Sequence, residues 1–166
     1  MKVKKFFESL KIKNLDLSND VIELRAHRIF NDYYNDEKIS NYVYGIYLKK
    51  EARLIGFCDL RLGDQNALAY LGNIGYSIFQ LYRGHNYAYM ASILLLELAS
   101  YLEVDSLIIT VNPDNIPSIK TIEKLGAQYI KRVPVPSHEP LFQQGDYEKL
   151  IYRIAIQPKG DSYGEL

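Results

Sequence analysis

The sequence predicts a single α/β domain, mainly because a strand–turn–helix unit occurs in it twice. The apolar run 71–79 precedes a glycine-containing turn, and apolar residues then recur at helical spacing over 88–102. A second apolar run, 107–111, precedes a shorter segment of helical spacing that ends at Gly126. Two earlier segments alternate apolar and polar residues, as strands with one buried face do. Strands first and strand–helix units later indicate a sheet flanked by helices.

In chain order, the first element is expected to be helical. Residues 17–35 open with three polar residues, which are typical of a helix N-terminus, and Val21, Leu24 and Ile29 follow. We expect one or two helices there, broken near Asn31 and Asp32. The two alternating segments then form a meander of strands over 42–48 and 54–62, joined by a charged turn.

The remaining elements follow the two strand–turn–helix units. After Gly126 we expect a strand, then an excursion bracketed by prolines, and then a closing strand, over 128–133, 134–146 and 150–156. The predicted order is α-β-β-β-α-β-α-β-β, in a mixed central sheet with helices on both faces. Residues 1–156 form the expected domain, and 157–166 are expected to be a flexible tail.

Composition limits the kind of protein this can be. The chain has 166 residues, which suits one domain with a substantial core. Its 20 basic and 20 acidic residues cancel without long blocks of either sign, so we expect no nucleic-acid partner. The single cysteine, Cys58, excludes an internal disulfide, and the scattered His27, His85 and His138 show no metal-ligand spacing. The sequence has neither the pattern of a secretory leader nor a segment as long as a membrane span, so we expect no membrane partner and a cytoplasmic location.

The turn at 82–88 is the first candidate site. It opens the helix expected at 88–102, so backbone N–H groups at its start are free to bind an anion, and the helix dipole and Arg83 add positive charge. These features predict phosphate binding. Taken alone, Gly84 is equally compatible with a sharp strand-to-helix corner and Arg83 with a solvated surface charge.

Two stretches taken together, YRGHNYA at 82–88 and VNPDNIPSIKTIEKLGA at 111–127, resemble the cofactor motifs of the GNAT superfamily of acyl-CoA-dependent N-acetyltransferases. The resemblance spans residues 54–156. Asn86 stands where the first motif usually has a glycine; asparagine tolerates left-handed backbone, so the turn can still form. The resemblance implies acetyl-CoA as co-substrate and the following cofactor-binding residues: Ile78, Arg83, Gly84, His85, Asn86, Tyr87, Ala88, Asn115 and Ser118.

Proton transfer is the part of the chemistry for which the sequence departs from the family. Many members have a tyrosine seven residues after the motif asparagine, where Ile122 stands here, and an acidic residue early in the cofactor strand, where Gly72 and Asn73 stand. Tyr76 and Asp59 are the candidate catalytic residues. Alternation places Asp59 on one face with Arg61, so a structural ion pair is the other interpretation of Asp59.

The function expected from these features is transfer of an acetyl group from acetyl-CoA to a primary amine by direct attack. The sequence does not define the acceptor, which is a small molecule or a peptide. It also does not define the acyl chain length or whether the protein forms a homodimer. The alternative is a catalytically silent acyl-CoA-binding or regulatory module, which would account for the missing proton-transfer residues.

Overall fold

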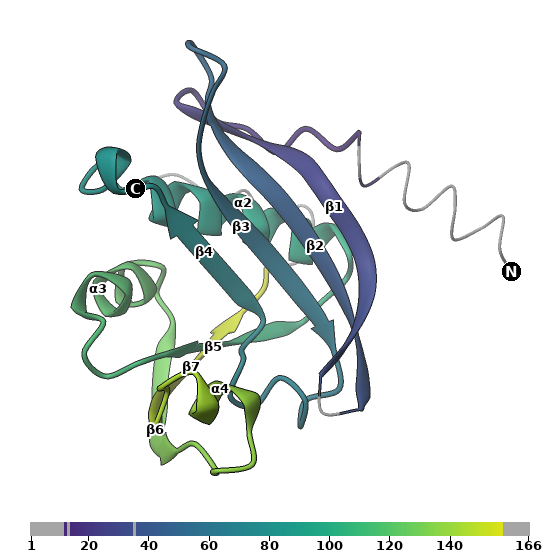
Figure 1. The fold of residues 1–166 in the computed structure, drawn as a ribbon. Coiled ribbons are helices and arrows are strands. Elements are labelled where there is room, and N and C mark those ends of the chain that lie inside the picture. The colour runs from purple at the N-terminus through teal and green to yellow at the C-terminus, as the bar shows by residue number, and fades with distance from the viewer. Residues whose placement is uncertain (1–11, 13, 35, 158–166) are drawn as a thin grey trace, which may run out of the picture.

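The structure is a computed structural model that describes residues 12, 14–34 and 36–157 (Figure 1). Its strands form two antiparallel sheets. Sheet A has the order β1-β2-β3-β4 and sheet B the order β5-β7-β6. The strands of sheet A are β1 (Ile22–Tyr34), β2 (Glu37–Leu48), β3 (Arg53–Gly63) and β4 (Ile74–Ile78). Those of sheet B are β5 (Ser106–Val111), β6 (Gln128–Pro134) and β7 (Glu148–Ala155).

Helices connect the strands in the predicted order from β4 onward. A 3-10 turn, η1 (Gln80–Tyr82), follows β4 and leads to α2 (Tyr87–Tyr101), and α3 (Ile116–Lys124) lies between β5 and β6. The excursion between β6 and β7 contains a short helix, α4 (Pro140–Gln143). The predicted α/β class is confirmed. Residues 158–166 of the predicted tail lie outside the described part of the chain.

The predicted helix at 17–35 is wrong, because most of this segment is the strand β1. Asn19 does not cap a helix: its Oδ1 accepts hydrogen bonds from the N–H groups of Val21 and Ile22, both at 2.8 Å, in a turn that starts the strand. Ile22 and Leu24 then point into the core with the two-residue period of a strand. A register shift between Ala26 and Arg28 breaks that period, which is why the apolar spacing resembled a helix.

The main core lies between sheet A and α2. Helix α2 runs across the back of the sheet in Figure 1, in contact with β1, β3 and β4. Leu94, Leu95 and Leu98 are at most 1% exposed in this interface, and each buried leucine side chain stabilises the fold by about 1.5–3 kcal/mol. Helix α3 packs against α2 and β5. Among the described residues, no helix is long and apolar enough to cross a membrane.

The two sheets are joined at Asn73, immediately before β4. The Asn73 N–H donates to the Ile108 carbonyl and the Ile108 N–H donates to Asn73 Oδ1, both at 2.7 Å. Asn73 Nδ2 also donates to the Arg61 carbonyl on β3 at 2.8 Å. Beyond this point, β4 and β5 diverge, as Figure 1 shows, and no ladder pairs them in the described residues. We call the space between β4 and β5 the wedge.

Candidate active site

In the described structure, the edge of β4 that faces the wedge is not paired with another strand. Along an antiparallel pair, hydrogen-bonded and non-hydrogen-bonded residues alternate. The Phe79 N–H donates to the Ile55 carbonyl at 2.9 Å, and the Arg61 N–H donates to the Asn73 carbonyl at 2.7 Å. Tyr76 and Ile78 lie in the alternate positions of this register. Their N–H and C=O groups therefore point away from β3 and towards the wedge.

The turn that follows η1 presents a second set of free N–H groups. In the described structure, the backbone N–H groups of residues 84–88 donate no hydrogen bond to the protein, and the first intrahelical bond of α2 runs from Met90 to Asn86 at 3.0 Å. Gly84 has a φ of +85° and Asn86 a φ of +61°, so both are left-handed, a conformation that asparagine tolerates better than most residues with a side chain. The positive end of the α2 dipole lies at this turn.

Side chains of the turn hold its shape. Arg83 Nε donates to the Ile78 carbonyl at 3.0 Å, which ties the turn to the end of β4. His85 Nδ1 lies 3.0 Å from the Arg83 carbonyl, and its ring stacks on that of Tyr87 with 5.4 Å between centroids. The position of His85 is that of a residue that shapes the turn.

The start of α3 meets β4 across the wedge. Asn115 caps α3 by accepting a 3.3 Å hydrogen bond from the Ser118 N–H. The Ser118 hydroxyl lies 2.6 Å from the Tyr76 hydroxyl. Burial raises the pKa of the Tyr76 phenol, and hydrogen bonds with Ser118 and Thr121 offset part of that shift. Tyr76 is therefore a neutral phenol at physiological pH, able to donate a proton.

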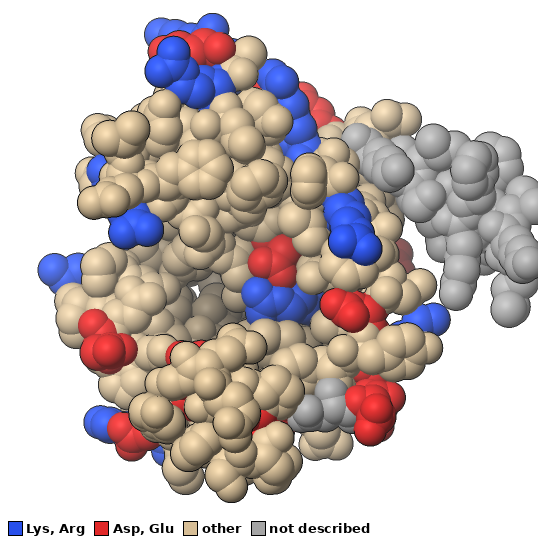
Figure 2. All heavy atoms as spheres, viewed as in Figure 1, with Lys and Arg blue, Asp and Glu red and all other residues tan. Residues whose placement is uncertain are grey.

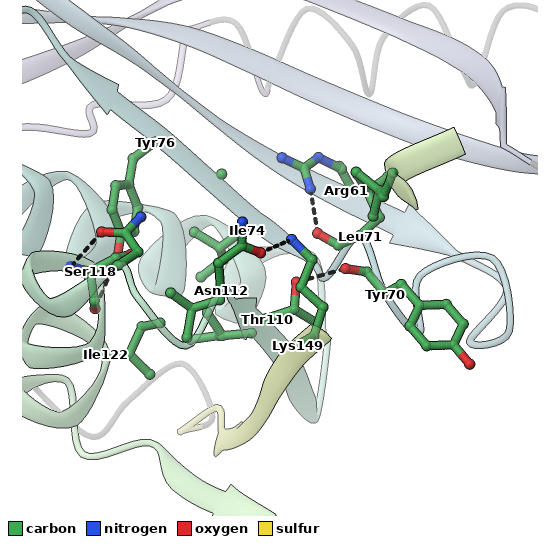
Figure 3. A pocket seen from close by; sticks show the side chains of 15 residues that line it. Arg61, Tyr70, Leu71, Ile74, Tyr76, Thr110, Asn112, Ser118, Ile122 and Lys149 are labelled. Carbon is green, nitrogen blue, oxygen red and sulfur yellow. Dashed lines mark hydrogen bonds between the residues drawn. The ribbon is translucent and has the colours of Figure 1, made fainter. Parts of the chain in front are cut away.

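A pocket of about 240 Å³ extends from this point between the two sheets. Figure 3 shows Tyr76, Ser118 and Ile122 at one end and Arg61, Leu71 and Tyr70 at the other. Ile74, Ile109 and Val111 give the pocket an apolar lining. In the space-filling view of Figure 2, the same face of the molecule is hollowed near its centre, and basic and acidic atoms meet beside the hollow. The pocket is thus open to a second molecule.

Asp59 and Arg61 form the ion pair that alternation on β3 predicted. Arg61 Nε donates to Asp59 Oδ2 at 2.5 Å and Nη2 to Oδ1 at 3.1 Å, while Nη1 donates to the Leu71 carbonyl at 2.8 Å. Gly75 lies beside this ion pair on the neighbouring strand β4. A Cβ atom there would overlap both charged groups, so a glycine leaves the room that the pair needs. Arg61 lines the pocket and Asp59 does not.

Lys149 is a pocket residue that sequence reasoning missed. It is 7% exposed, and its Nζ donates to Asn112 Oδ1 and to Asp146 Oδ2, both at 2.7 Å. Asn112 Nδ2 donates to Asp146 Oδ1 at 2.6 Å, which closes the network. Burial alone would raise the pKa of the Asp146 carboxyl, but the hydrogen bonds from Lys149 and Asn112 outweigh it and lower that pKa. The only local indication that Lys149 is buried was its place two residues from Ile151, on the same face of β7.

The excursion between β6 and β7 contributes one residue to the pocket lining. Leu141 of α4 lines the pocket, and the Tyr34 hydroxyl of β1 donates to Glu139 Oε2 at 3.1 Å. Burial and the Glu139 carboxylate raise the pKa of Tyr34 to about 12. The tyrosines of β1 and β2 do not line the pocket, whereas Tyr70 and Tyr76 do. No group of metal-ligating side chains comes together in the described residues.

Comparison with known proteins identifies the family. A sequence model of the acetyltransferase (GNAT) domain matches residues 3–128. No curated protein matches the sequence closely enough to count as a relative. Among solved structures, a protein described as a ribosomal-protein-serine acetyltransferase from Vibrio cholerae superimposes with a TM-score of 0.60 at 14% identity, covering 86% of this chain and 98% of its own.

Two further solved structures share the fold and were determined with ligands. RimL, a ribosomal L7/L12 α-N-protein acetyltransferase in complex with coenzyme A, has a TM-score of 0.61 at 14% identity over 83% of this chain and 96% of its own. The microcin C7 self-immunity acetyltransferase MccE, in complex with acetyl-CoA and AMP, has a TM-score of 0.53 at 17% identity, over 70% of this chain and 61% of its own. At such identities the likeness concerns the fold, whereas the match of the domain model over 3–128 shows that the chain belongs to the GNAT acetyltransferase family.

Proposed function

We propose that the protein is an N-acetyltransferase that moves an acetyl group from acetyl-CoA to a primary amine by direct attack, without a covalent enzyme intermediate. The observation that carries this proposal is the unpaired N–H of Ile78, which faces the wedge between a turn suited to phosphates and a pocket open to a second molecule. Membership of the GNAT family gives the acetyl donor, and MccE was solved with acetyl-CoA bound.

The residues of the turn fit the pyrophosphate of acetyl-CoA. Five consecutive N–H groups, those of Gly84, His85, Asn86, Tyr87 and Ala88, have no acceptor in the described protein, and phosphate oxygens are acceptors for such groups. No atom lies within 4 Å of a Cβ position built at Gly84, so a ligand has open access there. Arg83 contributes positive charge beside these N–H groups.

The residues along the wedge fit the remainder of acetyl-CoA, which supplies an activated acetyl group as a thioester. The backbone N–H and C=O groups of Tyr76 offer strand-like hydrogen bonds to the amides of the pantetheine arm. Asn115 and Ser118 face this edge from α3. We assign to the Ile78 N–H the role of donor to the thioester carbonyl, where negative charge develops during attack.

The reaction balances without an enzyme-bound acyl group. The amine nitrogen forms a bond to the carbonyl carbon, the carbon–sulfur bond breaks, and the sulfur leaves with the electron pair. The nitrogen loses one proton to water, the thiolate gains one, and an enzyme group that protonates the thiolate recovers its proton from water. Tyr76 is the proposed proton donor to the sulfur, because its phenol lines the pocket and stays protonated, since burial raises its pKa. Asp59, held by Arg61, is the weaker candidate for a catalytic role.

The alternative function is a silent acyl-CoA-binding or regulatory module, and two positions favour it. Ile122, where many family members have an acidic tyrosine hydroxyl, is 1% exposed and apolar. Asn73, where many have a carboxylate, uses both its side-chain atoms to join the sheets. Neither residue can transfer a proton, so catalysis depends on Tyr76, on Asp59 or on water.

Calorimetric titration and a thioester-cleavage assay test the proposal together. We expect CoA to bind, and thiol release from acetyl-CoA to require an added amine. The amine panel needs amino acids, peptide N-termini, polyamines and aminoglycosides, since the fold does not select among them. CoA binding without thiol release across the whole panel would instead support the silent module.

We place the protein in the cytoplasm, and fluorescence microscopy of a tagged chain tests that location.

A further inference from the structure

The charged groups that line the pocket are cations. Of its described lining residues, only Arg61 and Lys149 carry a charge, and no carboxylate lines it. Their partners Asp59 and Asp146 bind the same two side chains from outside the lining. A binding site for a polyamine or an aminoglycoside would be expected to present carboxylates to its ligand, and this pocket presents the opposite charge.

Each cation retains a hydrogen-bond donor. The Arg61 guanidinium has five N–H groups; those on Nε and Nη1 and one on Nη2 bind Asp59, Leu71 and Gly72. The Lys149 ammonium has three N–H groups and uses two, on Asn112 and Asp146. Within the described part of the chain, one N–H of Arg61 and one of Lys149 have no acceptor and remain for a ligand. The two acids keep the cations charged and fixed, so an anion meets preformed donors.

The position of the cations suits an anionic group on the acceptor, separate from the phosphates of the donor. Gly75, which lies against the Arg61 guanidinium, is three residues before Ile78 on β4, a distance of about 10 Å at strand spacing. The phosphate-binding turn lies beyond Ile78 in the opposite direction. An acetyl group at Ile78, an attacking nitrogen and a carboxylate a few bonds away would together span the pocket.

We propose that Arg61 and Lys149 bind the carboxylate of the acceptor, and that the acceptor is a small amino acid whose amine points along the pocket towards Ile78. The proposal rests on the proposed acetyltransferase function and names its substrate class. The pocket volume of about 240 Å³ is below the range of about 300–1,000 Å³ that is usual for larger ligands, which favours a free amino acid over a peptide. The aspartate side chain of a peptide N-terminus is the other source of a carboxylate.

Binding of the acetylated product tests the proposal without requiring turnover. N-acetylglycine and N-acetylglycinamide differ only in the carboxylate, and calorimetry in the presence of CoA compares them. We expect N-acetylglycine to bind at least about tenfold more tightly, as a charge-assisted hydrogen bond implies. Equal affinities would overturn the proposal. A preference shown only by an N-acetylated aspartyl peptide, against its asparaginyl counterpart, would also overturn it and would indicate a peptide acceptor.

Variants locate the carboxylate within the pocket. The double substitution Lys149→Met with Asp146→Asn removes one cation and its acid together, so no buried charge is left unpaired. We expect it to lower the carboxylate preference to about twofold or less, while CoA affinity is unchanged. The exposed Lys131 on β6 supplies the matched control, and Lys131→Met should keep the full preference. An unchanged preference in a folded double variant would overturn the proposal.

The same measurements separate this proposal from the acetyltransferase function. Carboxylate-selective binding without thiol release from any amine would mean that the amino-acid site exists but that acetyl transfer is wrong. Thiol release without discrimination between an amino acid and its amide would mean that the enzyme exists but that this substrate class is wrong.

Discussion

The two ends of the pocket are built from different parts of the chain. At the donor end, the polar groups are backbone N–H groups, presented by the edge of β4 and by the turn that opens α2. At the cation end, they are the side chains of Arg61 on β3 and Lys149 on β7. The donor end needs only a strand edge and a helix start with the right glycine, whereas the cation end needs two buried charges with their partners. The first is a property of local sequence and the second of tertiary structure.

The strongest test of the donor end is Gly84→Glu. A carboxylate at this position lies against the phosphates, so we expect CoA affinity to fall by at least about a hundredfold. The left-handed φ of +85° makes any side chain here cost about 1–2 kcal/mol of folding free energy. Gly84→Gln carries the same strain and nearly the same bulk, and it should lose clearly less affinity in calorimetry. Unchanged affinity in Gly84→Glu would show that the phosphates bind elsewhere.

Tyr76→Phe tests whether a side chain contributes at the donor end. If the phenol protonates the leaving thiolate, kcat should fall by about a hundredfold while CoA affinity stays constant. Because burial raises the pKa of Tyr76, the wild-type rate should rise with pH as the amine deprotonates and fall only above about pH 10. Ser118→Ala keeps the phenol and removes its partner, so its loss should be smaller. A fewfold change in Tyr76→Phe would leave the Ile78 N–H and substrate positioning as the sources of acceleration.

At the cation end, Lys149→Met should act first on stability. The substitution leaves Asp146 without its cation, and we expect the free energy of unfolding in urea to fall by about 3 kcal/mol. Adding Asp146→Asn should restore most of it. Because the Asp146 pKa is lowered in the fold, the stabilisation is present above its ordinary pKa of about 3.9 and is lost as pH falls through the folded value. A double variant that is no more stable than Lys149→Met would contradict this account of the network.

The smallest effect is expected for Asn86→Gly. Asn86 has a φ of +61° and its side chain makes no capping hydrogen bond, so glycine relieves backbone strain without removing a contact. CoA affinity should stay within about threefold of wild type or improve. A loss of more than tenfold in the same titration would mean that the asparagine amide binds the cofactor, and the donor end would then depend on a side chain as well.

The same contrast explains which features the sequence made predictable. The turn, the cap at Asn115 and the stop at Gly126 are local, because each depends on residues within one or two helical turns. Tyr76 and Ser118 were named separately, and their contact is tertiary. Lys149 meets Asn112 through the pairing of β7 with β5, and no local pattern encodes that pairing.

The error at β1 has a related physical cause. Its true period of two, visible at Ile22 and Leu24, extends over few residues before the register shift at Ala26. The spacing of Val21, Leu24 and Ile29 fits a helix as well as this short alternation fits a strand. The pairing of β1 with β2 along the whole of its length decided the outcome, since long-range hydrogen bonds outweigh weak local propensity.

Asn73 has a consequence for the range of acyl groups that the wedge can admit. A strand ladder fixes the separation of its two strands at every residue, but β4 and β5 are held together by one residue at one end, where an asparagine amide substitutes for backbone. The opening can therefore widen by a small rotation about this pivot without breaking any strand pairing. We therefore expect tolerance of a longer acyl chain to depend on Tyr76 and Ser118, whose hydroxyl contact links β4 to α3, and to be able to change in evolution while both sheets stay intact.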